Sequence, residues 1–119
     1  MPADKLPDPA SGFELSVKDV EALAPAIASG ELCLVDCREQ DEWDFNRITG
    51  ATLVPLSSFA EAAEQVVNAN KPTIVYCHHG IRSMRAASWL RSRGLEQSWS
   101  MRGGIDAWSD QIDSAVPKY

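Results

Sequence analysis

The sequence predicts an α/β domain built on a central, mainly parallel sheet with helices on both faces. Short apolar runs rich in strand-forming residues lie at 32–36, 52–55 and 73–77. Segments with helical periodicity lie between these runs and after the last of them, so strands alternate with helices. In such sheets ligands bind beyond the carboxyl ends of the strands, and Cys77 stands at one such end.

The first predicted helix is indicated by a capping residue before it, an apolar pattern within it and a glycine after it. Ser16 can cap a helix over 17–29, and Gly30 stands where that helix would end. Pro25 should bend or split it, because proline lacks a backbone N–H group and clashes with the preceding turn. One or two helical turns are expected over 39–45.

Two longer amphipathic helices are predicted in the second half of the chain. The first opens at Ser57 and ends near Asn70, and its inner face comprises Phe59, Ala62, Ala63, Val66 and Val67. The second covers 83–93 and stops at Gly94. Ser83 can cap this helix with its hydroxyl group.

The last predicted elements are a strand over 95–101 and a short helix over 105–112. Gly103 and Gly104 permit a tight turn between them. Aromatic rings bury a large apolar area, so a core position is expected for Trp43, Trp89 and Trp108.

Length and the amino-terminal composition predict the domain organisation. A chain of 119 residues suits one compact domain that can bury a core without disulfide or metal staples. Residues 1–12 contain three prolines and no continuous apolar stretch, so they are predicted to be a flexible lead-in, neither a secretory signal nor an anchor. Residues 13–119 are predicted to form the single domain, with no membrane segment.

Cysteine usage and charge exclude several classes of protein. Three cysteines without a CxxC pair argue against a disulfide framework and a four-ligand zinc site, and they favour a reducing cytoplasm. The net charge of -6 works against nonspecific binding to nucleic acid. The carboxyl-terminal half could still hold a small anion, because five arginines follow Cys77: Arg82, Arg85, Arg91, Arg93 and Arg102.

The segment 77–83 has the features of an anion-binding loop around a cysteine. It lies between a buried strand and the start of a helix, so backbone N–H groups and the helix dipole favour negative charge on the Cys77 sulfur. A thiol in this setting, beside Arg82, is expected to have a pKa of roughly 3.5 to 7.5. Gly80 allows the loop to curl around a single sulfur atom. Cys77 is therefore a candidate nucleophile.

Three segments of the chain resemble the rhodanese (sulfurtransferase) family. The family's active-site loop has the pattern C-x-x-G-x-R followed by Ser or Thr, which resembles Cys77-His78-His79-Gly80-Ile81-Arg82-Ser83. Residues 34–56 resemble the family's upstream box, and residues 101–108 resemble its closing Gly-Gly-x-x-x-Trp box. The three boxes span most of residues 32–108 in the family's order. The resemblance implies a rhodanese-like fold.

The resemblance also implies a sulfurtransferase mechanism. Cys77 would take a sulfane sulfur from a donor such as thiosulfate, hold it as a persulfide, and pass it to cyanide, a thiol or a sulfur-relay protein. This is covalent catalysis in two half-reactions. The substrate-binding loop would comprise His78, His79, Gly80, Ile81, Arg82 and Ser83, with Arg38 and Arg85 as candidate supporting residues. No metal or organic cofactor is required.

Some positions depart from the family pattern or carry no family role. Many relatives have His and Pro where this chain has Arg47 and Thr49. The rings of His78 and His79 could tune acceptor access by titrating near neutral pH. The alternative is that these side chains are exposed and that their backbone N–H groups matter more.

Several residues have both a structural and a functional interpretation. Cys33 falls in an apolar strand and is expected in the core. Cys37 follows another strand end, so it is either a buried filler or a resolving thiol that approaches the site. Arg38 and Glu42 are expected to form a structural ion pair beneath the site.

Two further functions are compatible with these residues. One is a cysteine-dependent phosphatase or arsenate reductase, and the other is a noncatalytic interaction module of the same fold. Phosphatases of this kind resemble C-x5-R, whereas four residues separate Cys77 from Arg82 here. This tighter ring suits one sulfur atom better than a phosphate. Interaction modules often lose the cysteine, which this chain retains.

Overall fold

Five parallel strands form one sheet in the described part of the chain. The structure is a computed structural model, and it describes residues 6–66 and 71–119. The strand order is β1-β5-β4-β2-β3, with all pairs parallel. The strands are β1 (Glu14–Leu15), β2 (Cys33–Asp36), β3 (Thr52–Leu53), β4 (Thr73–Tyr76) and β5 (Ser98–Met101). The predicted α/β class is confirmed.

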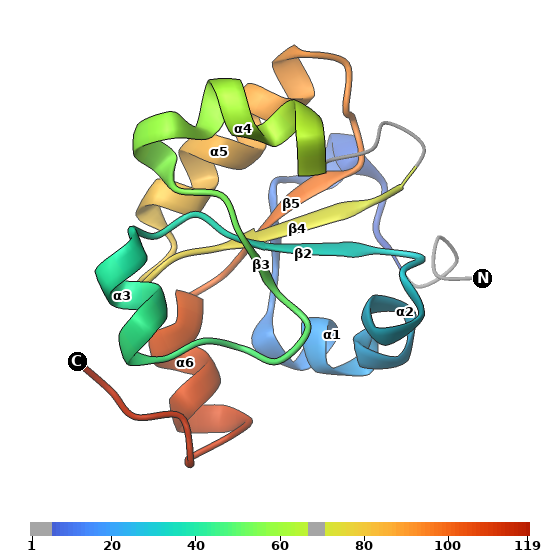
Figure 1. Cartoon of the computed structure of the whole chain (residues 1–119). Helices are drawn as coiled ribbons and strands as arrows, with labels where there is room; N and C mark the ends of the chain where they lie inside the picture. The colour runs from blue at the N-terminus through green and yellow to red at the C-terminus, as the bar shows by residue number, and fades with distance from the viewer. Residues whose placement is uncertain (1–5, 67–70) are drawn as a thin grey trace.

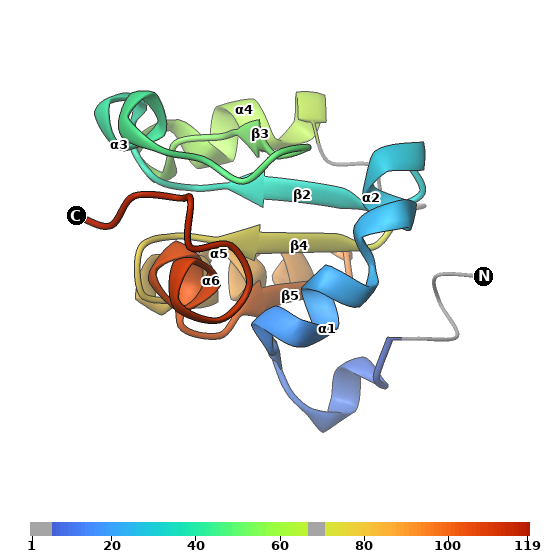
Figure 2. The ribbon, with the colours of Figure 1, turned by 90° about the horizontal axis from the view of Figure 1, so that it is seen from below.

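Helices cover both faces of this sheet (Figure 1). One face carries α4 (Phe59–Val66) and α5 (Ile81–Ser92). The opposite face carries α1 (Val17–Ala22), α2 (Ala24–Ser29) and α6 (Gly104–Gln111). The short helix α3 (Gln40–Phe45) stands at the carboxyl end of the strands, where α5 and α6 also begin (Figures 1 and 2). Two 3-10 helices, Pro9–Ser11 and Leu56–Ser58, complete the described elements.

The sheet separates two apolar clusters. Successive residues of a strand point to opposite faces, so Ile74 and Tyr76 lie in the cluster under α1 and α6. Val75 and Cys77 lie in the cluster under α4 and α5, together with Leu90. Strand alternation therefore places the side chain of Cys77 on the α4 and α5 side.

The first predicted helix is split as expected. Ser16 and Asp19 form a capping box at the start of α1. The helix breaks at Leu23, and Pro25 occupies the first turn of α2, where its missing N–H group has no intrahelical partner to lose. Gly30 ends α2 in the left-handed conformation (φ 84°).

Two predicted boundaries are wrong. The helix α4 begins at Phe59 after a 3-10 turn, because the hydroxyl of Ser57 donates to the carboxylate of Glu39 (2.7 Å) and does not cap the helix. The predicted end of that helix near Asn70 lies outside the described residues. The strand expected over 95–101 begins only at Ser98.

The tryptophans and Cys33 are less buried than expected. Trp43, Trp89 and Trp108 are half-buried, and Cys33 is half-buried as well. Trp108 and Trp89 pack against the two apolar clusters, and the guanidinium of Arg47 lies 4.6 Å from the ring centre of Trp43. The fully buried indole is that of Trp99 in β5.

The amino-terminal segment contacts the domain from Leu6 onward. Leu6 packs against the cluster under α1 and α6. The guanidinium of Arg91 donates to the carbonyl groups of Pro9 (2.9 Å) and Gly12 (2.7 Å). Residues 1–5 of the predicted lead-in lie outside the described residues.

The described helices are short. The longest, α5, has 12 residues. A bilayer requires about 20 apolar residues in helical form. Accordingly, no helix in the described part of the chain is long and apolar enough to span a membrane.

Candidate active site

Cys77 lies directly after β4, at the turn into α5. Its sulfur accepts hydrogen bonds from the backbone N–H groups of Gly80 (3.0 Å) and Ser83 (3.4 Å). The hydroxyl oxygen of Ser83 lies 3.5 Å from the same sulfur. These donors belong to the loop and the first turn of α5, where the helix dipole also favours negative charge.

The surroundings of Cys77 stabilise its thiolate. A hydrogen bond from the Cys37 thiol, followed by those from Ser83 and Gly80, lowers the pKa of Cys77 to about 4, although burial of the sulfur acts in the opposite direction. The same arrangement, together with burial, raises the pKa of Cys37. At neutral pH the pair therefore consists of a Cys77 thiolate and a Cys37 thiol.

A pH titration of the thiolate absorbance tests this assignment. Because the pKa of Cys77 is lowered, its thiolate is present above that pKa, and the absorbance is lost as the pH falls through it. We expect the difference spectrum between the wild-type protein and a Cys77→Ser variant to show a midpoint near pH 4. A midpoint near that of a free thiol, about 8.5, would contradict the assignment.

Gly80 determines where α5 begins. It is the N-cap of α5 in the left-handed region (φ 105°), so the helix starts at Ile81. Ser83 is therefore the third residue of the helix and not its cap, which corrects the predicted role. Its hydroxyl lies between the Cys77 sulfur and the hydroxyl of Ser100 (2.7 Å), a contact that the sequence did not reveal.

The start of α6 holds the loop from the other side. The N–H groups of Ile105 and Asp106 donate to the carbonyl oxygens of Cys77 (2.9 Å) and His78 (3.1 Å). These carbonyl oxygens thus accept hydrogen bonds from α6, while the N–H groups of Gly80 and Ser83 point to the sulfur. A Cβ atom on Gly104 would overlap both carbonyl oxygens, so the close approach of α6 requires glycine.

Arg82 is paired with Glu42 of α3. Its two terminal nitrogens donate to the two carboxylate oxygens at 2.7 and 2.9 Å. The hydroxyl of Tyr119 donates to the same carboxylate (2.6 Å). The Arg82 guanidinium and this hydroxyl lower the pKa of Glu42 to about 2. The predicted ion pair between Arg38 and Glu42 is therefore wrong.

Arg38 is fully buried and pairs with Asp36. One terminal nitrogen lies 2.7 Å from the Asp36 carboxylate. The guanidinium also donates to the side-chain oxygen and the backbone carbonyl of Asn46, each at 2.7 Å, and to the hydroxyl oxygen of Tyr119 (2.9 Å). Arg38 thus contacts neither the sulfur nor Glu42, because Asp36 and Asn46 engage its guanidinium.

The two histidines occupy different environments. His78 is half-buried, with its ring stacked on Tyr119 (centroids 3.9 Å apart), whereas His79 is exposed. His78, His79 and Asp106 could hold a metal ion, since their ligand atoms lie within 4.8 Å of one another. The two imidazole rings are stacked, however, and the ammonium of Lys118 lies 3.4 Å from the Asp106 carboxylate.

The arginines that follow Cys77 do not converge on the loop. Arg82 belongs to the loop, and Arg85 is exposed on α5 without a hydrogen bond to the sulfur among the described contacts. The others face different parts of the protein: Arg91 the amino-terminal segment, Arg93 the ring of Trp89, and Arg102 the carboxylate of Glu14. Ile81 is 71% exposed at the start of α5.

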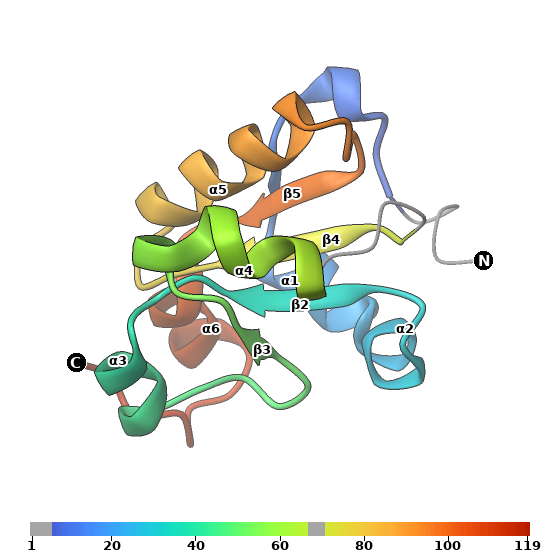
Figure 3. The same ribbon diagram turned by 45° about the horizontal axis from the view of Figure 1, so that its top comes forward.

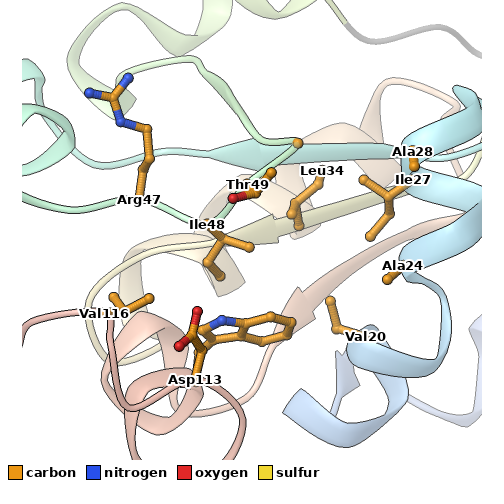
Figure 4. Close-up of a pocket in the computed structure, with 12 residues that line it drawn as sticks. Val20, Ala24, Ile27, Ala28, Leu34, Arg47, Ile48, Thr49, Asp113 and Val116 are labelled. Atoms are coloured by element: carbon orange, nitrogen blue, oxygen red, sulfur yellow. The ribbon is translucent and has the colours of Figure 1, made fainter.

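A separate apolar cavity of about 310 Å³ lies between α1, α2, α6 and the loop before β3 (Figure 4). Its lining residues include Ile27, Ile48 and Trp108, and also Arg47 and Thr49. The lining contains no cysteine or histidine. This cavity is therefore distinct from the site around Cys77.

Comparison with known proteins shows where the chain belongs. Residues 19–111 match the rhodanese-like domain family. The chain is 32% identical over 112 residues to the chloroplastic rhodanese-like/PpiC domain-containing protein 12 of Arabidopsis thaliana, an alignment that covers 87% of this chain but only 38% of that protein. It is 31% identical over 82 residues to the thiosulfate sulfurtransferase GlpE of Coxiella burnetii, covering 69% and 76% of the two chains.

A solved structure shares the fold. The crystal structure of a rhodanese-related protein from Thermoplasma volcanium superposes with a TM-score of 0.74 and 26% identity, over 85% of this chain and 94% of that one. The family match includes the Cys77 loop and the whole of the two flanking segments, 34–56 and 101–108, that resemble the family. The chain belongs to the rhodanese-like domain family.

Proposed function

We propose that this protein is a sulfurtransferase that carries sulfur on Cys77. It takes a sulfane sulfur from a small anionic donor such as thiosulfate and passes it to a thiophilic acceptor. The observation that carries this proposal is the Cys77 sulfur, which lies buried among the N–H groups of Gly80 and Ser83 with a lowered pKa. The likeness to the thiosulfate sulfurtransferase of C. burnetii supports the choice of donor.

In the first half-reaction the Cys77 thiolate attacks the outer sulfur of thiosulfate. The S–S bond of the donor breaks, its electron pair leaves with sulfite, and a persulfide remains on Cys77. The donors that now bind the thiolate then stabilise the negative charge of the persulfide. No metal or organic cofactor takes part in this step.

In the second half-reaction an acceptor attacks the outer sulfur of the persulfide. Cyanide, a small thiol or the cysteine of a sulfur-relay protein can serve, because each is a nucleophile toward sulfur. The Cys77 thiolate is the leaving group, and its lowered pKa makes it a good one. The first step produces the Cys77 persulfide and the second step consumes it, so ping-pong kinetics are expected.

Arg82 acts on the donor through its charge. Its guanidinium is held in a two-point ion pair with Glu42, so its position is fixed and part of its charge is offset. Thiosulfate and a phosphate monoester are both doubly charged anions, so this pairing does not separate the two functions. The four-residue spacing between Cys77 and Arg82, shorter than the C-x5-R of phosphatases, favours sulfur transfer over the phosphatase alternative.

Intact-mass measurement tests the proposed function. The reduced protein is mixed with thiosulfate, separated at once from excess reagent and weighed, then treated with cyanide and weighed again. We expect the mass of one sulfur atom to be gained and then lost, with thiocyanate appearing in equal amount. The cyanide step distinguishes a persulfide from a sulfonated or oxidised cysteine, which cyanide does not remove.

A protein that gains no sulfur from thiosulfate or from other sulfane donors, such as polysulfide, and forms no thiocyanate when cyanide is present during the reaction would contradict the proposal. Hydrolysis of an aryl phosphate or reduction of arsenate by the same sample would then support the phosphatase-like alternative. Inactivity in all of these assays would favour a noncatalytic interaction module.

A further inference from the structure

Two cysteines meet at neighbouring strand ends. Cys37 directly follows β2, and Cys77 directly follows β4. The register pairs Asp36 with Tyr76, and the N–H group of Cys37 continues the ladder by donating to the carbonyl of Tyr76 (3.0 Å). The next pair in this register is Cys37 and Cys77. Figure 3 shows β2 and β4 side by side beneath α4.

This register brings the two backbones within the range of a disulfide. Neighbouring strands lie about 4.8 Å apart, and a disulfide joins residues whose Cα atoms are about 4.4 to 6.8 Å apart. Cys37 and Cys77 therefore need no large backbone movement to be joined.

The side chains also point the same way. Both residues are buried (0% and 1% exposed) and belong to one apolar cluster together with Val35 and Val75. The neighbouring Cys37 thiol lowers the pKa of Cys77, and Cys77 in turn raises the pKa of Cys37. A buried thiol that no step of the sulfur transfer uses therefore lies on the strand end next to the residue that carries the sulfur.

We propose that Cys37 is a resolving thiol that releases the bound sulfur as sulfide. The Cys37 sulfur attacks the inner sulfur of the Cys77 persulfide, a Cys37–Cys77 disulfide forms, and hydrosulfide leaves. This inference rests on the proposed function, since it requires the persulfide on Cys77. It adds a second product, sulfide, and a second enzyme form.

The step balances without an external oxidant. The bond between Cys77 and its outer sulfur breaks, and the bond between Cys77 and Cys37 forms. The outer sulfur gains one electron as it becomes sulfide, and the Cys37 sulfur loses one electron as it enters the disulfide, while the Cys77 sulfur keeps its oxidation state. The proton of the Cys37 thiol leaves with the sulfide. A dithiol reductant then restores both thiols, so continued turnover consumes one dithiol for each sulfide released.

Competition between Cys37 and an external acceptor decides the fate of the sulfur. Hydrogen bonding to Cys77 and burial keep Cys37 protonated while Cys77 is a thiolate, so Cys37 does not compete for the donor. Once the persulfide has formed, an acceptor can attack its outer sulfur while Cys37 can attack its inner one. The protein therefore transfers sulfur when an acceptor is present and releases sulfide when none is.

The test follows the persulfide in the absence of an acceptor and of oxygen. Reduced wild-type protein and the variants Cys37→Ser, Cys37→Ala and Cys33→Ser are loaded with thiosulfate, separated from it, and weighed at intervals. Cys33 is the matched control, because it lies at the start of β2, four residues before Cys37 and about 13 Å from it along the chain direction.

In the wild-type and Cys33→Ser proteins we expect the added sulfur to disappear. The final mass should be lower than that of the reduced protein by two hydrogen atoms, with one equivalent of sulfide released and a peptide map that joins Cys37 to Cys77. In both Cys37 variants the persulfide should persist at least about tenfold longer and no disulfide should form.

The outcomes separate this inference from the function on which it rests. Sulfur that persists equally in the wild-type and Cys37 variants, without sulfide or disulfide, would overturn the resolving role and leave the sulfurtransferase intact. A failure of every protein to gain sulfur would overturn the sulfurtransferase and the resolving role with it. Should the Cys37 variants misfold, the wild-type peptide map and sulfide yield still decide the question.

Discussion

A Cys77→Ser variant is expected to lose sulfur loading from thiosulfate by on the order of 10⁴-fold or more. Serine preserves the size of the side chain, but its hydroxyl stays protonated at neutral pH, so it supplies no anionic nucleophile. The donors from Gly80 and Ser83 stabilise a thiolate and cannot compensate for its absence. Loading is measured as the rate at which one sulfur atom is gained by intact mass.

The control for this experiment is Cys33→Ser, which keeps both Cys37 and Cys77 and should gain sulfur at the wild-type rate. Circular dichroism and thermal unfolding show whether each variant is folded, because residue 77 is buried. A Cys77→Ser protein that is loaded as fast as the wild type would identify another thiol as the nucleophile.

An Arg38→Met variant is expected to lower the free energy of unfolding by about 3–5 kcal/mol. The guanidinium of Arg38 and the carboxylate of Asp36 are both fully buried, and they form an ion pair at 2.7 Å. Methionine fills much of the space but leaves the Asp36 charge uncompensated and the oxygens of Asn46 without their donor. Urea unfolding measures the loss, which is a large part of the roughly 5–15 kcal/mol that stabilises an ordinary domain.

Two further variants test whether the loss of stability comes from the buried ion pair of Arg38 and Asp36. Arg93→Met removes an exposed arginine from the end of α5, and we expect a change within about 0.5 kcal/mol. Combining Asp36→Asn with Arg38→Met removes both charges and should recover part of the loss. If the single variant Arg38→Met were as stable as Arg93→Met, the buried pair would not contribute as described.

The reactive loop could be predicted because its chemistry is local. Cys77, Gly80 and Ser83 lie within seven consecutive residues, and a strand before them with a helix after them determines which way their N–H groups point. The exact donors could not be predicted, because they depend on where α5 begins. Gly80 takes the capping position, which moves Ser83 inward to the sulfur.

The partners that come from elsewhere in the chain could not be predicted. Ser100, Ile105 and Tyr119 reach the loop or its supports only through tertiary packing. For the same reason Glu42 could be identified as a pairing residue but was assigned to the wrong arginine. Local sequence indicates that a carboxylate needs a partner, whereas the packing of α3 against α5 decides which arginine is near.

In the fold, too, local features could be predicted from the sequence and features that depend on tertiary packing could not. The splitting of the first helix could be predicted from Ser16, Pro25 and Gly30, because caps and proline act within one turn. The strand β1 was missed, since Glu14–Leu15 is too short to produce an alternating pattern. It exists because it pairs with β5 at the edge of the sheet, with Leu15 aligned to Met101.

The hydrogen bonds that α6 makes to the loop after β4 have a consequence for the order in which the site forms during folding. In a chain whose β5 and α6 have not yet docked, the Cys77 loop lacks the contacts of Ser100, Ile105 and Asp106. Pairings between segments distant in sequence form late, because loop closure must precede them. The loop after β4 therefore takes its final shape only once β5 and α6 have docked.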